Sequence, residues 1–266
     1  VLDDANLRDD FKALALGVPS QADIEQQSRP ADPPAVWQAR FDVQAAIARF
    51  LLPHLKSRLV APETLKTAAQ RRLQNKLVSL GCAAGDPDIF QMAAEQAVGD
   101  VMSLVMGALQ ALNSYDCSER KESLSAFHEK WSEDHLVLEK WFALEAGSSV
   151  GGTISHLNIL MAHKHFDFKS PNKIRSVLGV FAAANPMQFH KADGTGYHFV
   201  AEQLAELDKR NPQISARLGL TLTRFQHYAS QRQDLMRAAL MSLSKNTLSA
   251  DLAEIVNKAL VDQNSQ

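Results

Sequence analysis

SPNKIRSVLGVFAAANPMQFHKADGTGYHFVAEQLAELDKRNPQISAR, residues 170–217, is the stretch that decides the fold of this chain. It contains three helix starts, because Ser170, Asn185 and Asn211 each stand directly before a proline. A Ser or Asn oxygen can accept a hydrogen bond from a free N–H of the first turn, and proline suits the first helical position. Residues 193–196, Asp-Gly-Thr-Gly, predict a turn with two residues able to take positive φ. The stretch therefore predicts short helices with sharply defined ends.

The same helical pattern extends over nearly the whole chain. Apolar residues recur three and four positions apart, as in Leu73, Leu77 and Leu80. The nearest approach to a strand pattern is residues 221–223, and it lies inside a helical pattern. Breaks come at Pro and Gly, and Pro53 is expected to end or kink a helix. We expect an all-α fold, and helices without one dominant heptad fit stacked antiparallel helix pairs better than a four-helix bundle.

Length and composition indicate an ordinary globular protein. The chain has 266 residues, of which 45% are hydrophobic and 22% charged, so it can bury a substantial core. The longest apolar patch, residues 101–112, is shorter than the roughly 20 residues that a membrane span needs. We expect a soluble, cytoplasmic piece of a longer protein, a single domain over 1–266 with its softest joint at 147–152. Cys82 and Cys117 are expected to be reduced thiols.

The net charge of −2 hides an uneven distribution. Residues 169–245 contain 11 Lys and Arg against 5 Asp and Glu, so this segment is positive and the remainder negative. A positive surface attracts anions at range and is screened by salt. Solvated helix faces are the simpler explanation of the excess.

No motif in the chain predicts a metal or nucleotide site. His128-Glu129 begins like the H-E-x-x-H zinc motif, but position 132 is Ser, and His135 lies two turns on. His163 and His165 would point apart on a helix and could share an ion only if the helix has ended before them. The glycines of residues 193–196 lack the preceding strand and third glycine of a dinucleotide site. We expect no bound metal in this chain.

From about Trp131 to its C-terminus the chain resembles the C-terminal helical domain of bacterial, proteobacterial-type aminopeptidase N, a family of zinc aminopeptidases. No single piece is specific, but their order and spacing together are. The matching pieces are Glu139-Lys140-Trp141-Phe142-Ala143-Leu144, Asn172-Lys173-Ile174-Arg175-Ser176, Asn185-Pro186 with Phe189-His190, Asp193-Gly194-Thr195-Gly196-Tyr197, Asn211-Pro212-Gln213, Arg232-Gln233 and Met236-Arg237-Ala238-Ala239-Leu240.

The resemblance implies a curved, α-solenoid-like superhelix of helix pairs of the HEAT or armadillo type. It also implies that the zinc ligands, the general base and the Gly-x-Met-Glu-Asn segment lie in a separate catalytic domain. Neither H-E-x-x-H nor Gly-x-Met-Glu-Asn occurs here, so this chain alone is expected to hydrolyse nothing. The expected partners are the catalytic and N-terminal domains of the parent enzyme and small peptides, with no nucleic acid and no membrane.

Three residues are candidates for substrate binding. A guanidinium is a rigid fork of donors that fits a carboxylate, and an exopeptidase must hold the C-terminal carboxylate of a short peptide. Arg175 and Arg217 match family positions that meet the C-terminal side of the peptide. Gln213 matches a residue near the pocket for the first side chain of the substrate.

A second function class stays open from sequence. The chain could be a free-standing helical-repeat scaffold that binds a protein or nucleic acid through a positive concave face. Steeply salt-dependent binding to RNA or DNA would favour it.

Overall fold

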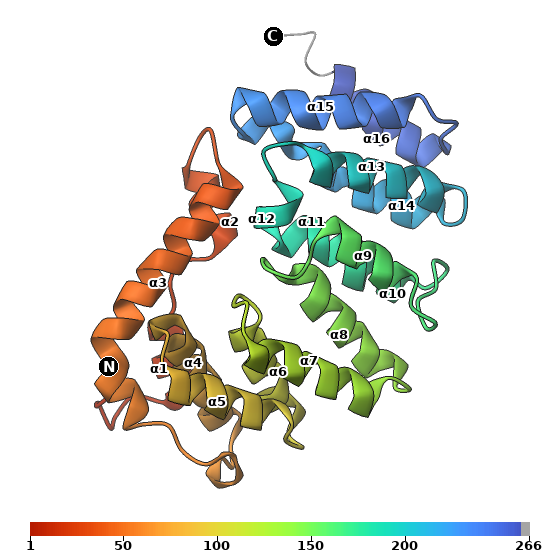
Figure 1. The fold of residues 1–266 in the computed structure, drawn as a ribbon. Coiled ribbons are helices and arrows are strands. Elements are labelled where there is room, and N and C mark those ends of the chain that lie inside the picture. Colours follow the sequence, from red (N-terminus) through yellow and green to blue (C-terminus); the bar gives the residue numbers. More distant parts are fainter. Residues whose placement is uncertain (262–266) are drawn as a thin grey trace. The chain divides into compact units, whose positions relative to one another are not determined.

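The computed structural model describes residues 1–261, and these residues form helices joined by short loops (Figure 1). The one β pairing among them is an isolated parallel bridge between Ala31 and Tyr228. The predicted all-α class is confirmed. Residues 221–223, the nearest to a strand pattern, lie in and directly after the 3₁₀ turn η3, Leu220–Leu222.

The chain divides into two compact units. The first comprises residues 1–20 and 38–144, and the second comprises residues 21–37 and 145 onward. The chain passes from one unit to the other between residues 20 and 21 and again within two helices: α3, Pro33–Lys56, and α8, His135–Gly147. Pro53 lies inside α3, so the helix does not end there.

In the first unit, helices near in sequence pack on one another. Helix α4 packs on α1, α5 and α6, and α5 packs on α6 and α7. Contacts with the next helix and with the one after it are the pattern of stacked helix pairs. The remaining elements of this unit are α1 (Asp9–Ala15), η1 (Pro62–Thr64), α4 (Ala68–Ala84), α5 (Pro87–Ala97), α6 (Met102–Leu112) and α7 (Ser118–Trp131).

The second unit repeats this packing scheme. Helix α13 packs on α12, α14 and α15, while α16 packs on α14 and α15. The elements of this unit are α2 (Gln21–Gln27), α9 (Ile154–Met161), α10 (Pro171–Ile174), η2 (Arg175–Gly179), α11 (Val180–Ala184), α12 (Pro186–Phe189), α13 (Thr195–Asp208), α14 (Pro212–Gly219), η3, η4 (Arg224–His227), α15 (Ser230–Ser244) and α16 (Ala250–Val261).

The core of the second unit is rich in aromatic rings. Phe181, Phe189 and Tyr197 are buried, with Phe189 edge-on to the other two at ring-centroid distances of 5.9 and 5.2 Å. Edge-to-face rings of this kind add to the free energy gained by burial. The cluster supports α11, α12 and α13, which stand behind the site described below.

The predicted cap-proline helix starts are confirmed in their positions. Helices α10, α12 and α14 begin at Pro171, Pro186 and Pro212. Asn185 Oδ1 accepts from Gln188 N at 3.3 Å, and Asn211 Oδ1 accepts from Ile214 N at 3.3 Å. Ser170 stands at its cap position without the side-chain hydrogen bond.

The turn at residues 193–196 uses its two glycines differently. Gly194 has φ of 74°, the left-handed conformation that favours glycine. Gly196 lies within α13 and has no positive φ. A Cβ at Gly196 would stand 2.3 Å from the carbonyl oxygen of Phe189, so glycine is required there by close approach.

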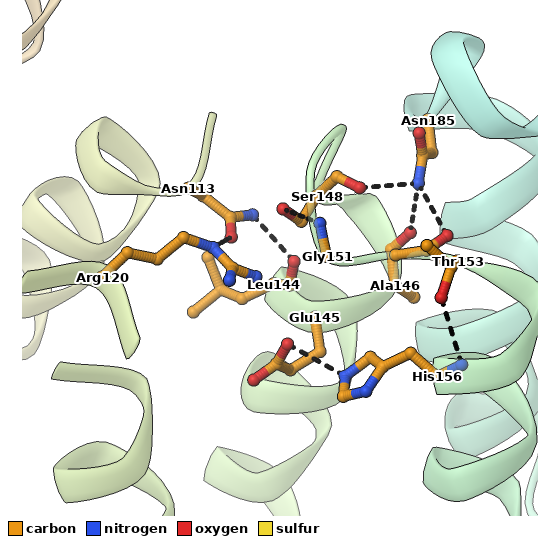
Figure 2. Close-up of polar contacts among 11 residues, drawn as sticks. Asn113, Arg120, Leu144, Glu145, Ala146, Ser148, Gly151, Thr153, His156 and Asn185 are labelled. Carbon is orange, nitrogen blue, oxygen red and sulfur yellow. Dashed lines mark hydrogen bonds and ion pairs between the residues drawn. The ribbon is translucent and has the colours of Figure 1, made fainter. Parts of the chain in front are cut away.

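Within the second unit, Asn185 ties the loop after α8 to the start of α12 (Figure 2). Its Nδ2 donates to the carbonyl oxygens of Ala146, Ser148 and Gly152 at 3.0, 2.9 and 3.2 Å. The side chain is 1% exposed, so these bonds form away from water, where an unpaired amide or carbonyl is costly. That residues 147–152 form the most flexible joint of the chain concerns motion and stays a prediction.

Both cysteines are free thiols, as predicted. Burial raises the pKa of the Cys82 thiol to about 12, which keeps it protonated and unreactive. Over residues 1–261, none of the helices combines the length and the apolar character needed to cross a bilayer.

We predict that Asn185→Asp lowers the free energy of unfolding by about 2–4 kcal/mol, because it places an oxygen against three carbonyl oxygens. The matched control is Asn211→Asp, which keeps its cap bond and removes an amide without such partners. Urea denaturation of both variants measures the difference. Equal losses of stability would show that the three carbonyl contacts contribute nothing.

Candidate functional site

Arg175 lies where a helix changes its hydrogen-bond pattern. Helix α10, the π-helical segment η2 and helix α11 run without a break from Pro171 to Ala184, and Arg175 opens η2. Such π segments within α-helices are frequent at functional sites. The side chain is exposed, and its Nη1 donates a 3.4 Å hydrogen bond to Asn172 Oδ1. The guanidinium keeps most of its donors open to a ligand.

Helix α14 presents Gln213 and Arg217 to solvent. They are four residues apart and therefore lie one above the other on one face of the helix. The opposite face is buried, and Ser215 Oγ donates to the carbonyl oxygen of Leu204 at 2.9 Å. The α13–α14 contact thus determines which way Arg217 points.

Arg175 and Arg217 line one hollow of about 340 Å³, which we call the first hollow. Its other walls are the apolar residues Ile174, Ile214 and Leu218. The structure therefore brings together two of the three candidate residues named from the sequence. Gln213 lies on the same face of α14 as Arg217, one turn earlier, and does not line this hollow.

A second hollow of about 410 Å³ shares Arg217 with the first. Arg224 and Tyr228 line it from the segment after α14, and Gln21 and Glu25 line it from α2. Sequence reasoning counted Arg224 only as part of the positive segment. The chain between Arg217 and Arg224 leaves α14 and passes through η3, so helical periodicity gives no signal that connects them.

The arginines of the second unit fall into two groups. Arg232 pairs with Asp32 at 2.9 Å, and Arg237 pairs with Asp234 at 3.9 Å. Arg210 lies over the ring of Phe168 at 5.2 Å from its centroid. In contrast, Arg175, Arg217 and Arg224 have no carboxylate within ion-pair distance among residues 1–261. These three guanidinium groups are the ones that line the two hollows.

Two titratable residues in the lining of the second hollow, His190 and Tyr228, are uncharged at neutral pH. His190 is buried, and its Nδ1 lies 2.8 Å from Tyr197 Oη. Burial, with a smaller effect from Arg232, lowers the pKa of His190 to about 3. Burial also raises the pKa of the Tyr228 phenol to about 12. At neutral pH the charges that face the hollow are therefore those of the arginines and Glu25.

The described residues do not fit a zinc ion. No group of three His, Cys, Asp or Glu side chains in residues 1–261 is placed to hold a metal. The ring of His128 packs on Trp141 with centroids 4.3 Å apart. Helix α9 ends before His163, which the sequence had left open. His163 Nδ1 is nevertheless occupied, because it accepts a hydrogen bond from the backbone N–H of His165 at 3.2 Å.

Comparison with known proteins shows the family to which the chain belongs. The model of a family described as "Domain of unknown function (DUF3458_C) ARM repeats" matches residues 1–261. The chain is 31% identical over 272 residues to aminopeptidase N of Escherichia coli (strain K12), covering 98% of the chain and 31% of that protein. It is 34% identical over 259 residues to aminopeptidase N of Haemophilus influenzae, covering 94% of the chain and 30% of that protein.

A solved structure agrees with these matches. Aminopeptidase A of Legionella pneumophila, in complex with aspartic acid, superposes with a TM-score of 0.87 at 26% identity and covers 98% of this chain and 32% of that one. The chain thus spans less than a third of the length of each of these proteins. The resemblance inferred from residues 131–266 and the helical-repeat fold class are confirmed.

We predict that the free energy of unfolding decreases as the pH is lowered, and that His190 causes part of this decrease. The unfolded histidine has the higher pKa, near its ordinary value of 6.5, so the unfolded state binds the extra proton as the pH falls from there toward about 3. The free energy of unfolding that depends on neutral His190 is fully present above pH 6.5 and is lost as the pH falls from there toward about 3. The loss is at most about 1.4 kcal/mol per pH unit. Urea denaturation of this chain as a function of pH measures it.

His190→Gln should flatten that pH dependence below the ordinary histidine pKa, while a change at exposed His227 to Gln should leave it unchanged. Unaltered slopes in both variants would exclude His190 as the group responsible.

Proposed function

The chain belongs to the ARM-repeat family designated DUF3458_C, and on that premise we propose that it is the C-terminal helical domain of a zinc aminopeptidase. In this proposal it closes the cavity in which the parent enzyme removes the N-terminal residue of a peptide. It restricts access to small peptides and holds the C-terminal side of the substrate. The aminopeptidase relatives support this function over the free-standing scaffold.

The observation that carries the proposal is the hollow shared by Arg175 and Arg217. Both guanidinium groups are exposed and lack an acidic partner among residues 1–261. A peptide carboxylate would supply that partner and could accept two hydrogen bonds from each fork. A bound peptide that covers the apolar residues Ile174, Ile214 and Leu218 would exclude water from the pair and so strengthen the attraction.

Gln213 has a different role in this proposal. It stands one turn from Arg217 on the exposed face of α14 and lines neither hollow. Its amide can donate and accept a hydrogen bond. We assign it to the pocket for the first side chain of the substrate, most of which belongs to the catalytic domain.

The chemistry of peptide hydrolysis belongs to another part of the parent protein. A zinc ion there would supply an activated water and polarise the scissile carbonyl. The donor set of residues 1–261 does not fit such an ion. In this proposal the residues of this chain bind and orient the substrate. Holding the far end of a short peptide makes attack at its first bond effectively intramolecular. A cytoplasmic location remains part of the proposal.

We predict that Arg175→Gln and Arg217→Gln in the full-length parent each lower kcat/KM for a tripeptide about tenfold or more. Loss of a charge-assisted hydrogen bond of about 1.5–3 kcal/mol accounts for that ratio. Hydrolysis of the matching tripeptide amide, which has no carboxylate, should change little. Arg210→Gln is the control, since Arg210 lies over Phe168. Equal losses on acid and amide would refute the carboxylate anchor.

We also predict that the isolated chain binds no stoichiometric zinc and releases no amino acid from alanyl arylamides. Metal analysis after dialysis and an activity assay test this, with the full-length parent as the positive control. One zinc per chain, or activity that a chelator abolishes, would contradict the assignment of catalysis to another domain.

A further inference from the structure

The lining of the second hollow includes charges of both signs. Arg217 lines it from α14, Arg224 from η4 and Glu25 from α2. Neither arginine lies within ion-pair distance of Glu25 in the described residues. Oppositely charged groups that share a hollow without touching leave room for a ligand that carries both charges.

Arg224 is positioned by the buried residues beside it. It opens η4, and its neighbours Leu222 and Phe225 are both fully buried. The backbone is therefore anchored on either side of an exposed guanidinium. The Arg224 charge is also close enough to lower the pKa of the Tyr228 phenol, against the larger effect of burial, which raises it. Arg224 and Tyr228 thus face the same space.

Glu25 is held in place by a residue of its own helix. Gln21 Nε2 donates to Glu25 Oε1 at 2.5 Å and to the carbonyl oxygen of Pro33 at 2.8 Å. Gln21 Oε1 is buried without a hydrogen-bond donor among residues 1–261. We call this side of the hollow, where the Glu25 carboxylate can accept from an ammonium or guanidinium group, the acceptor wall.

Backbone and side-chain bonds fix the segment that follows α2 to the rest of the second unit. Ala31 N donates to the carbonyl oxygen of His227 at 2.8 Å, and Arg232 pairs with Asp32 at 2.9 Å. Arg232 also donates to the carbonyl oxygen of His190. The acceptor wall is therefore set by contacts far apart in the sequence, and a volume of about 410 Å³ is within the usual range for a ligand site.

We propose that the second hollow is a separate subsite for the last residue of a peptide substrate. The peptide carboxylate binds Arg217 and Arg224, and a lysine or arginine side chain on that residue binds Glu25. This inference rests on the proposed function, in which the first hollow holds the carboxylate between Arg175 and Arg217. Arg217 serves both hollows, so peptides of different length end in one or the other.

The mixed charge of the walls selects the ligand class. A polyanion such as a nucleotide would meet two arginines but also the carboxylate of Glu25, which repels it. A peptide end with a carboxylate and a basic side chain satisfies both walls. The hollow therefore favours substrates with a basic C-terminal residue.

The test uses the full-length parent and alanine peptides from dipeptide to hexapeptide, each as free acid and as C-terminal amide. The measured quantity is the acid-to-amide ratio of kcat/KM at each length. We expect Arg224→Gln to lower this ratio about tenfold, equivalent to about 1.4 kcal/mol, at lengths other than those sensitive to Arg175→Gln. Arg217→Gln should lower it at both sets of lengths, and Arg210→Gln at none.

A second series compares peptides that end in lysine with peptides of the same length that end in norleucine. Glu25→Gln should reduce the preference for lysine several-fold, and only at the lengths sensitive to Arg224→Gln. Glu202→Gln, an exposed carboxylate on α13, is the matched control.

The outcomes separate the two proposals. There is no second subsite, and the proposed function stands, if Arg224→Gln leaves the acid-to-amide ratio unchanged at every length. The same conclusion holds if Arg224→Gln lowers the ratio at the same peptide lengths as Arg175→Gln. If Arg175→Gln and Arg217→Gln leave every ratio unchanged, the proposed function itself fails. A lysine preference that Glu25→Gln does not alter would overturn the role of the acceptor wall.

Discussion

The contact between α13 and α14 is the constraint on which the site depends. Ser215 and Leu204 are fully buried, and the hydroxyl of Ser215 donates to the carbonyl oxygen of Leu204. Because a buried polar group must find a partner, this bond fixes the orientation of α14 about its own axis. Gly219 lets the end of α14 approach Leu252, where a Cβ would come within 2.9 Å of that side chain. With this face buried, Arg217 has to point outward.

The distribution of carboxylates is as important as that of arginines. Asp32 is engaged by Arg232, and the buried Asp208 accepts from the backbone N–H and the hydroxyl of Ser249. These carboxylates connect distant segments, including α13 to the start of α16. Among residues 1–261 no carboxylate lies within ion-pair distance of Arg175, Arg217 or Arg224, although Glu25 lines the second hollow with the last two. The first hollow therefore carries positive charge alone, which attracts anions, and the second carries charges of both signs.

Whether a contact could be predicted from the sequence depends on how far apart in the chain its two partners lie. The cap at Asn185 could be predicted because its bond to Gln188 spans three residues, but its three bonds to the loop at 146–152 could not. The glycine at 196 was predicted only to be able to take positive φ; it is helical instead, and the close approach of the Phe189 carbonyl oxygen requires it. Arg175 and Arg217 were paired through the family resemblance, and no pattern linked Arg224 or Glu25 to them.

The sequence by itself determined the helices, their proline-opened starts and the positive character of residues 169–245, because caps, periodicity and charge are local properties of the chain. Tertiary structure alone decided that Arg175 and Arg217 share a hollow and that residues of α2 complete a second one. These placements depend on side chains that meet across long stretches of chain, as Ala31 meets His227 and Asp32 meets Arg232. Burial and complementary hydrogen bonding select such contacts, and no local pattern encodes them.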